Sequence, residues 1–229
     1  MRGLTLARGC ASFLSKSVAR NFVASRTIFS TAKCLSVQAE LTGALAEEIK
    51  AEKDLESKNL SGHSAPVITG FTVTANDAEV KLTKTHGTEK ICVILNVNHS
   101  VEMGDEESGE ASDPVALPPF SIEITKGEER LCFHMELVET EDGKFDYAVE
   151  EYYVAPASKN EGDDADASVY ASSGRYIDPK LHDLLFVRYL EERGFTQAFC
   201  GELVNYATHY EHTRYVSLLS KINEFVGRS

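Results

Sequence analysis

The apolar residues of this chain change their spacing twice along its length. Between residues 67 and 154 they recur at every second position, as in a strand with one buried face, and on both sides of this stretch they recur every three to four positions, as in helices. The turn-type pairs Asn76-Asp77 and His86-Gly87 allow only tight reversals, so the first three strands are expected to form an antiparallel meander. Strands are predicted at 69–74, 79–84, 90–98, 120–126, 130–139 and 145–154, with a short seventh at 169–171.

One face of this predicted sheet is expected to be buried. Val80 and Leu82 alternate with polar residues, and Ile122 and Ile124 do the same, so each strand has an apolar side and a polar side. The apolar face must be buried against another layer, and the flanking helical segments can form that layer. The sequence therefore predicts an α+β fold.

Two helices are predicted at the C-terminal end. Asp178 followed by Pro179 is a strong helix start, because the Asp side chain accepts first-turn amides and proline has no amide to leave unpaired. Gly194 is expected to end this helix and Thr196 to cap the second one. The first helix is expected to be covered on most sides, since its apolar positions surround it. These are Leu181, Leu184, Leu185, Phe186, Tyr189 and Leu190.

A third helix is predicted at residues 36–55, where apolar residues recur every four positions in one narrow stripe. A narrow stripe suits pairing with another helix, and the last helix offers a nearly heptad stripe of its own. We therefore expect the two ends of the domain to meet, in a seam that also supports an oligomer. The packing residues are Leu41, Leu45, Ile49, Tyr215, Leu219, Ile222 and Val226.

Two C-terminal stretches resemble the signature of the mitochondrial acidic matrix protein family, also called the mitochondrial glycoprotein family. They are YIDPKLHDLLFVRYLEERGF at residues 176–195 and EHTRYVSLLSKINEFV at residues 211–226. Arg214 and Leu218 depart from the family pattern, which commonly has Glu and Trp at these positions. The resemblance extends over most of the chain after residue 44, through the shorter segments 45–50, 70–71, 80–82, 89–100 and 119–124.

This family includes the receptor for the globular heads of the first complement component. The resemblance implies a strongly twisted seven-stranded antiparallel sheet with one N-terminal and two C-terminal helices, assembled as a doughnut-shaped homotrimer. It also implies a mitochondrial matrix protein linked to translation, ribosome assembly and RNA metabolism.

Residues 1–35 have the composition of a mitochondrial transit peptide. They contain six bases, several serines and no acid, because the first acid of the chain is Glu40. The alternative is a basic arm for nucleic acid, but such arms seldom carry so many apolar residues. We expect cleavage near Ser36 and an acidic α+β domain at residues 36–229.

The remaining domain is strongly acidic. Residues 36–229 carry 36 acids against 17 bases, a formal charge of −19, and 20 of these acids lie between residues 101 and 170. Three runs, in predicted loops near 101–114, 139–142 and 156–168, are expected to bind basic partners, with a merely solubilising surface as the alternative. The predicted partner-binding residues are Asp105, Glu106, Glu107, Glu110, Glu139, Glu141, Asp142, Glu161, Asp163, Asp164 and Asp166.

No catalytic, cofactor or metal residue is predicted. The run from Asp163 to Asp166 lacks the glycine and closing Glu of a calcium loop, which leaves weak calcium binding as an alternative. His209 and His212 are expected on a solvated helix face, and Cys92, Cys132 and Cys200 are expected as free buried thiols.

The charge and the resemblance together favour a non-catalytic matrix adaptor or chaperone for basic proteins, such as RNA-binding or ribosomal ones. Direct nucleic-acid binding is the second candidate, but it needs clusters of Lys and Arg that residues 36–229 lack. An enzyme with an unrecognised site is the third. No stretch approaches the roughly 18 apolar residues of a membrane span.

Overall fold

Seven strands pair into one antiparallel sheet in the order β1-β2-β3-β6-β7-β8-β9, which confirms the predicted α+β architecture. The computed structural model describes residues 31–59, 66–102, 114–158, 162–163 and 165–228. The strands of the sheet are β1 (Thr72–Asn76), β2 (Glu79–His86), β3 (Glu89–Asn96), β6 (Phe120–Lys126), β7 (Glu129–Glu139), β8 (Phe145–Pro156) and β9 (Ser172–Ser173). Each predicted strand is present within a few residues.

The tight turns form where the sequence places them. Asp77, between β1 and β2, and Gly87, between β2 and β3, both have positive φ angles, 51° and 59°. A second ribbon was not predicted: β4 (Val101–Glu102) pairs with β5 (Val115–Ala116). Each of these strands is two residues long, too short to show the alternation of polar and apolar residues that identifies a strand in a sequence. The Ala116 amide fixes the ribbon to the last helix by donating to Thr208 Oγ1 at 2.9 Å.

The sheet has an inner face, which packs on the C-terminal helices, and an outer face. Alternation along β2, β3, β6 and β7 puts large apolar side chains on the inner face, where they meet the apolar residues that follow residue 185. The largest fully buried residues include Phe133, Phe186, Phe195, Leu82, Ile122 and Leu203. The hydrophobic core therefore lies between these two layers.

The helical segment after Asp178 is α2 (Pro179–His182), η3 (Asp183–Arg188) and α3 (Tyr189–Glu191), with a turn of π-helix at η3. Asp178 caps it as predicted, accepting from the amides of Lys180 and Leu181. The expected cover on most sides is wrong, because Leu181 and Leu184 are 54% and 41% exposed. In a molecule of two layers, a helix on the sheet keeps its far side in solvent.

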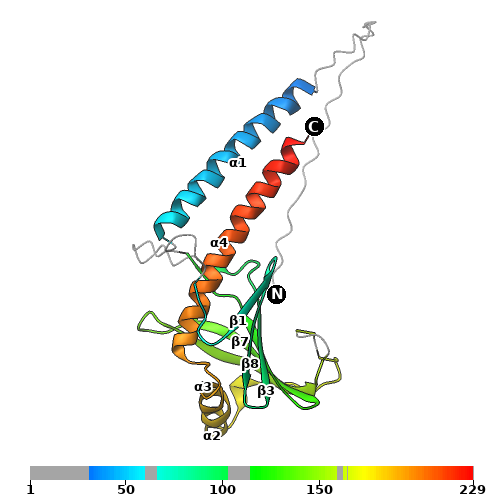
Figure 1. Ribbon diagram of the computed structural model, residues 1–229, viewed down its shortest axis with the longest axis vertical. Helices are drawn as coiled ribbons and strands as arrows, with labels where there is room; N and C mark the ends of the chain where they lie inside the picture. The colour runs from blue at the N-terminus through cyan, green and yellow to red at the C-terminus, as the bar shows by residue number, and fades with distance from the viewer. Residues whose placement is uncertain (1–30, 60–65, 103–113, 159–161, 164, 229) are drawn as a thin grey trace, which may run out of the picture.

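The long helices α1 (Thr31–Asn59) and α4 (Gln197–Gly227) lie side by side and antiparallel, so the two ends of the domain meet as predicted (Figure 1). Thr196 caps α4 by accepting from the Phe199 amide at 3.3 Å, and Gly194 before it has the expected positive φ of 88°. At the far end of the seam the Gln38 side chain donates to the Val226 carbonyl. This helix pair projects beyond the sheet, and α1 packs on α4 rather than on the sheet.

The seam between α1 and α4 is thin. Leu219 is buried and Leu45, Ile49 and Val226 are half-buried, but Leu41, Tyr215 and Ile222 remain exposed. The histidines of α4 correct the sequence analysis. His209 is buried, and His212 approaches Glu52 of α1, with Nε2 3.3 Å from Oε2. His212 therefore faces α1 in the seam rather than solvent.

Candidate protein-binding surface

The second acidic run forms the turn between β7 and β8. Thr140 closes this turn through its amide, which donates to the Lys144 carbonyl at 2.7 Å, and Gly143 supplies a positive φ of 70°. Glu141 and Asp142 point into solvent, and Asp142 has a nearby cation, with Lys144 Nζ at 3.5 Å. The backbone holds the turn, so its exposed carboxylates are accessible to a partner.

The third acidic run lies in the loop after β8, and its described acids are tied to that loop. The Asp163 carbonyl accepts from Arg130 Nη2 at 2.6 Å, and its carboxylate accepts from Ser158 Oγ at 2.8 Å. Asp166 accepts from the Ser168 amide at 2.8 Å, and hydrogen bonds from Ser168 lower the pKa of this carboxyl. Both side chains are exposed.

These two acidic regions lie at opposite ends of β7 and β8. Glu139 pairs with Phe145 at one end, whereas Arg130, which holds Asp163, pairs with Ala155 at the other. Nine residues of strand at about 3.3 Å each separate them by roughly 30 Å. The Debye length at physiological salt is about 8 Å, so within one chain their fields act separately. Asp105, Glu106, Glu107, Glu110, Glu161 and Asp164 lie outside the described residues.

A cavity of about 330 Å³ opens on the outer face of the sheet, which the sequence analysis did not predict. The cross-strand register brings its polar wall together: Ser121 lies beside His134, and Cys132 lies between Glu123 and Tyr153. All five alternate with core residues, so they point away from the helices. The available sequence signal was the set of polar residues that alternate with core residues along β6 and β7.

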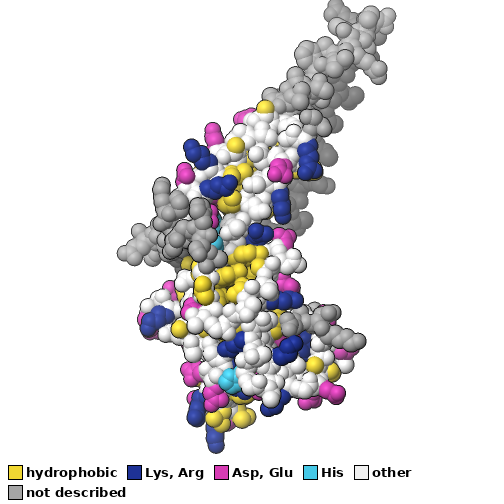
Figure 2. Space-filling view, viewed as in Figure 1, with side chains coloured by type: hydrophobic (Ala, Val, Ile, Leu, Met, Phe, Trp, Pro, Cys, Tyr) yellow, Lys and Arg dark blue, Asp and Glu magenta, His cyan; other side chains and the backbone are white. Residues whose placement is uncertain are grey.

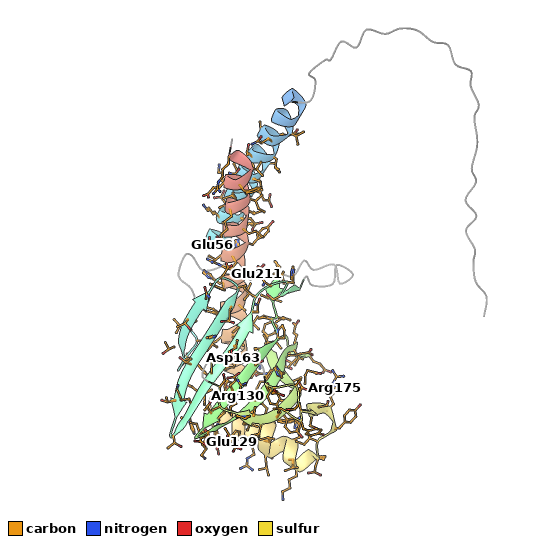
Figure 3. The ribbon with its side chains drawn as sticks, turned by 90° about the vertical axis from the view of Figure 1, so that its right-hand side faces the viewer. Glu56, Glu129, Arg130, Asp163, Arg175 and Glu211 are labelled. Atoms are coloured by element: carbon orange, nitrogen blue, oxygen red, sulfur yellow. The ribbon has the colours of Figure 1, made fainter. Side chains whose placement is uncertain are left out.

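A hydrogen-bonded network lines this cavity. Ser121 Oγ lies 2.9 Å from His134 Nδ1, and His134 Nε2 lies 3.3 Å from the Tyr153 hydroxyl. Burial raises the pKa of the Cys132 thiol to about 11 and that of the Tyr153 hydroxyl to about 12, so both stay protonated at neutral pH. Below them, Arg130 Nη1 donates to Glu123 Oε1 at 2.8 Å, and both residues are buried. Figure 3 shows Arg130 of β7 and Asp163 of the loop after β8 close together.

The network resembles a hydrolase triad in composition but not in geometry. Glu151 lies opposite His134 on β8 and would be the third member of such a triad. Its Oε2 is 4.0 Å from His134 Nε2, beyond hydrogen-bond range. β6 is paired on both sides, so the amides next to Ser121 serve the sheet ladders rather than an oxyanion. The described residues at this site therefore suit binding rather than acyl transfer.

A second hollow, of about 620 Å³, lies between α4 and the turns at the end of the sheet. Tyr215 and Leu218 of α4 form one wall, and Ala78, Val97 and Val101 line the other. Figure 2 shows hydrophobic side chains gathered at mid-height, where α4 passes the end of the sheet. Further along α4, Ile222 and Phe225 are exposed on the part that projects from the sheet.

Two kinds of site are absent among the described residues. No group of three or more His, Cys, Asp or Glu is placed to hold a metal ion. Within the same ranges, no helix combines the length and apolarity needed to cross a membrane. Cys92, Cys132 and Cys200 are buried, as predicted, and form no disulfide among the described residues.

Comparison with known proteins gives a consistent result. A family model described as mitochondrial glycoprotein matches residues 45–226. The conserved regulator of innate immunity protein 3 of Caenorhabditis elegans is 54% identical over 222 residues, 94% of each chain. The human mitochondrial complement component 1 Q subcomponent-binding protein is 30% identical over 200 residues, 80% of this chain and 69% of its own.

Solved structures agree on the fold. A Leishmania major protein, described as a sequence homologue of human p32, superposes with a TM-score of 0.61 at 19% identity, covering 83% of this chain and 99% of its own. The p22 protein of Trypanosoma brucei gives 0.58 at 20% identity, covering 84% of this chain and all of its own. The sequence resemblance to this mitochondrial family is thus confirmed.

Proposed function

Because this chain belongs to the mitochondrial glycoprotein family, we propose that it is a non-catalytic adaptor or chaperone of the mitochondrial matrix that binds basic proteins. Several of its relatives are named as mitochondrial and for the complement component that they bind. The proposal adds to this the location in the matrix and the basic character of the partner.

The exposed acidic turn between β7 and β8 carries the proposal. Backbone hydrogen bonds close this turn, and among the described residues its exposed carboxylates make one ion pair, from Asp142 to Lys144. They belong to a domain with a formal charge of −19 over residues 36–229. Such a surface attracts basic proteins and repels nucleic acid, which needs basic clusters.

The basic partner is proposed to be an RNA-binding or ribosomal protein. Such proteins carry the Lys- and Arg-rich surfaces that an acidic domain would recognise. Through this partner the chain would influence mitochondrial RNA processing or translation, while its own contact with RNA stays weak.

The assembly is proposed to be a homotrimer. The α1 and α4 pair projects from the sheet with Leu41, Leu218, Ile222 and Phe225 exposed, and exposed apolar residues in such numbers mark an interface. A trimer would also triple the number of acidic regions that one partner can meet.

The test measures the association rate with a basic ribosomal protein across a salt series. Replacing Glu139, Glu141 and Asp142 by Gln or Asn should slow association and flatten its salt dependence, because exposed charges act mainly on the on-rate. Replacing Asp105, Glu106, Glu107 and Glu110 tests the first run in the same way. Unchanged kinetics after all runs are neutralised would contradict the proposal.

Two controls complete this experiment. Naked RNA should bind poorly under the same conditions, and tight RNA binding would favour direct nucleic-acid recognition instead. N-terminal sequencing of the native protein should find a start near Ser36, as expected for import into the matrix. An intact Met1 would contradict that location.

A further inference from the structure

We infer that the cavity on the outer face of the sheet receives an arginine side chain of the basic partner. This inference rests on the proposed function and names the anchor point that the acidic turns lack. The cavity has about 330 Å³, the lower end of the range for small-ligand sites. One long side chain fits such a space, whereas a helix or strand does not.

The wall of the cavity is rich in oxygen acceptors. Its lining residues include Glu79, Glu123 and Asp163, and none of those described is Lys or Arg. The Glu79 carboxylate is shared with Lys81, whose Nζ lies 3.3 Å from Oε1. Ser121 and Tyr153 add hydroxyl groups, which can accept as well as donate. A ligand that only donates hydrogen bonds, as guanidinium does, matches this lining.

Glu123 is the central group, because it is already desolvated and only partly used. The residue is 8% exposed, and Arg130 Nη1 occupies Oε1 at 2.8 Å. No hydrogen bond from a described residue reaches Oε2, although Glu123 lines the cavity. A buried carboxylate is most stable when both of its oxygens accept hydrogen bonds. Because folding has already removed water from Glu123, a cation that enters the cavity does not have to desolvate this carboxylate.

One guanidinium already lies behind this wall, bonded to two of its lining residues, although Arg130 itself does not line the cavity. Arg130 is 3% exposed and lies between the Glu123 carboxylate and the Asp163 carbonyl, which it reaches at 2.6 Å. The chain thus shows that this environment stabilises an arginine with charge-assisted hydrogen bonds. Asp163, at the rim, supplies a further negative charge for a second one.

The remaining lining favours arginine over lysine. His134 and Tyr153 form a ring pair with centroids 5.6 Å apart, and a planar guanidinium can stack on such rings. Ile94, Pro119 and Met135 line the apolar part of the cavity, where the methylene stem of the side chain would lie. A lysine ammonium would gain the stem contacts but not the stacking.

The test uses an arginine- and glycine-containing peptide and the purified full chain. Citrulline in place of arginine keeps the shape and removes the charge, so its affinity should fall by about 10 to 100 fold, the range of lost charge-assisted hydrogen bonds. Lysine in place of arginine should bind with intermediate affinity. Equal affinity for the arginine and citrulline peptides would overturn the inference.

Ser121→Leu should fill the cavity and weaken the arginine peptide by at least about tenfold, while leaving the acidic turns intact. Thr125→Leu is the matched control, since it lies on the same strand and face but outside the cavity. Full affinity in Ser121→Leu would overturn the cavity and leave the proposed function standing. No salt-dependent binding of the wild-type chain to any basic peptide would instead remove the proposed function.

A measurement on the wild-type chain keeps the test independent of folding in the variant. On addition of the arginine peptide, NMR signals of His134 and of the Ile94 methyl groups should shift, with saturation at the same concentration as the binding curve. Shifts confined to the turn at Glu141 and Asp142 would place the peptide elsewhere and overturn the inference.

Discussion

Replacing Glu89 by Gln tests how the end of the YLEERG helix is fixed to the sheet. Arg193 Nε donates to Glu89 Oε2 at 2.8 Å, and Nη2 donates to Oε1 at 3.0 Å, with both side chains 8% exposed. This pair joins the helix to the start of β3 across 104 positions of sequence. The amide of Gln can replace one acceptor at most and leaves the guanidinium charge without its counter-charge.

The expected loss follows from burial. Breaking a buried pair by removing one partner costs about 3–5 kcal/mol, because the remaining charge stays desolvated. Arg193 keeps its hydrogen bond to the Tyr189 carbonyl and its stack on the Tyr189 ring, so we expect the lower end of this range. For a domain of this size, each kcal/mol lowers Tm by about 2–4 °C, which gives a loss of roughly 6–12 °C.

Urea unfolding followed by circular dichroism measures this loss, and a double-mutant cycle isolates the pair. Arg193→Met combined with Glu89→Gln should be less destabilising than the sum of the single changes, since no buried charge remains. Lys126→Met is the control, because Lys126 Nζ approaches Glu89 at 3.9 Å but is 72% exposed. A loss below about 1 kcal/mol for Glu89→Gln, the value of an exposed pair, would refute this reasoning.

Three further predictions concern other contacts of the fold. Gly174→Ala should lower Tm, because a Cβ there would overlap the Val149 carbonyl oxygen, and weakened hydrogen-exchange protection at β9 is the check. Leu219→Asp should place a charge in the seam of α1 and α4 and reduce the mass seen by light scattering, whereas a monomeric wild type would contradict the proposed trimer. Glu211→Gln should raise Tm at pH 7 and lose this advantage in acid. Burial raises the pKa of Glu211, so its charged form costs stability above that pKa and the cost disappears as the carboxyl is protonated.

The order and type of the main elements could be predicted because local signals decide them. Alternation in β2 and β6, the cap at Asp178 and the left-handed Gly194 all depend on neighbouring residues. The pairing of Glu89 with Arg193 could not be predicted, since it depends on how the helix settles on the sheet. The π-helical turn at η3 has a similar origin: the Tyr147 hydroxyl donates to the Phe186 carbonyl at 2.7 Å, and Tyr147 is far away in sequence.

The candidate surface was predictable in its exposure but not in its arrangement. Glu141 and Asp142 are exposed as their composition indicates. Their separation from Asp163 follows from topology, because the turn before an antiparallel strand and the loop after it lie at opposite ends. The cavity between these regions was missed, since Glu123, Cys132 and His134 read as the solvent side of half-buried strands.

The separation of the acidic regions limits which partners can use both. A basic group at the β7–β8 turn and another at Asp163 must be roughly 30 Å apart, the length of about nine residues of extended chain. A shorter peptide reaches one region only, and its affinity depends on one set of charges. A segment that spans both gains the second contact at high effective concentration, and its path along β7 passes the cavity that holds Ser121 and His134. The geometry therefore favours extended, arginine-containing tails over compact basic patches.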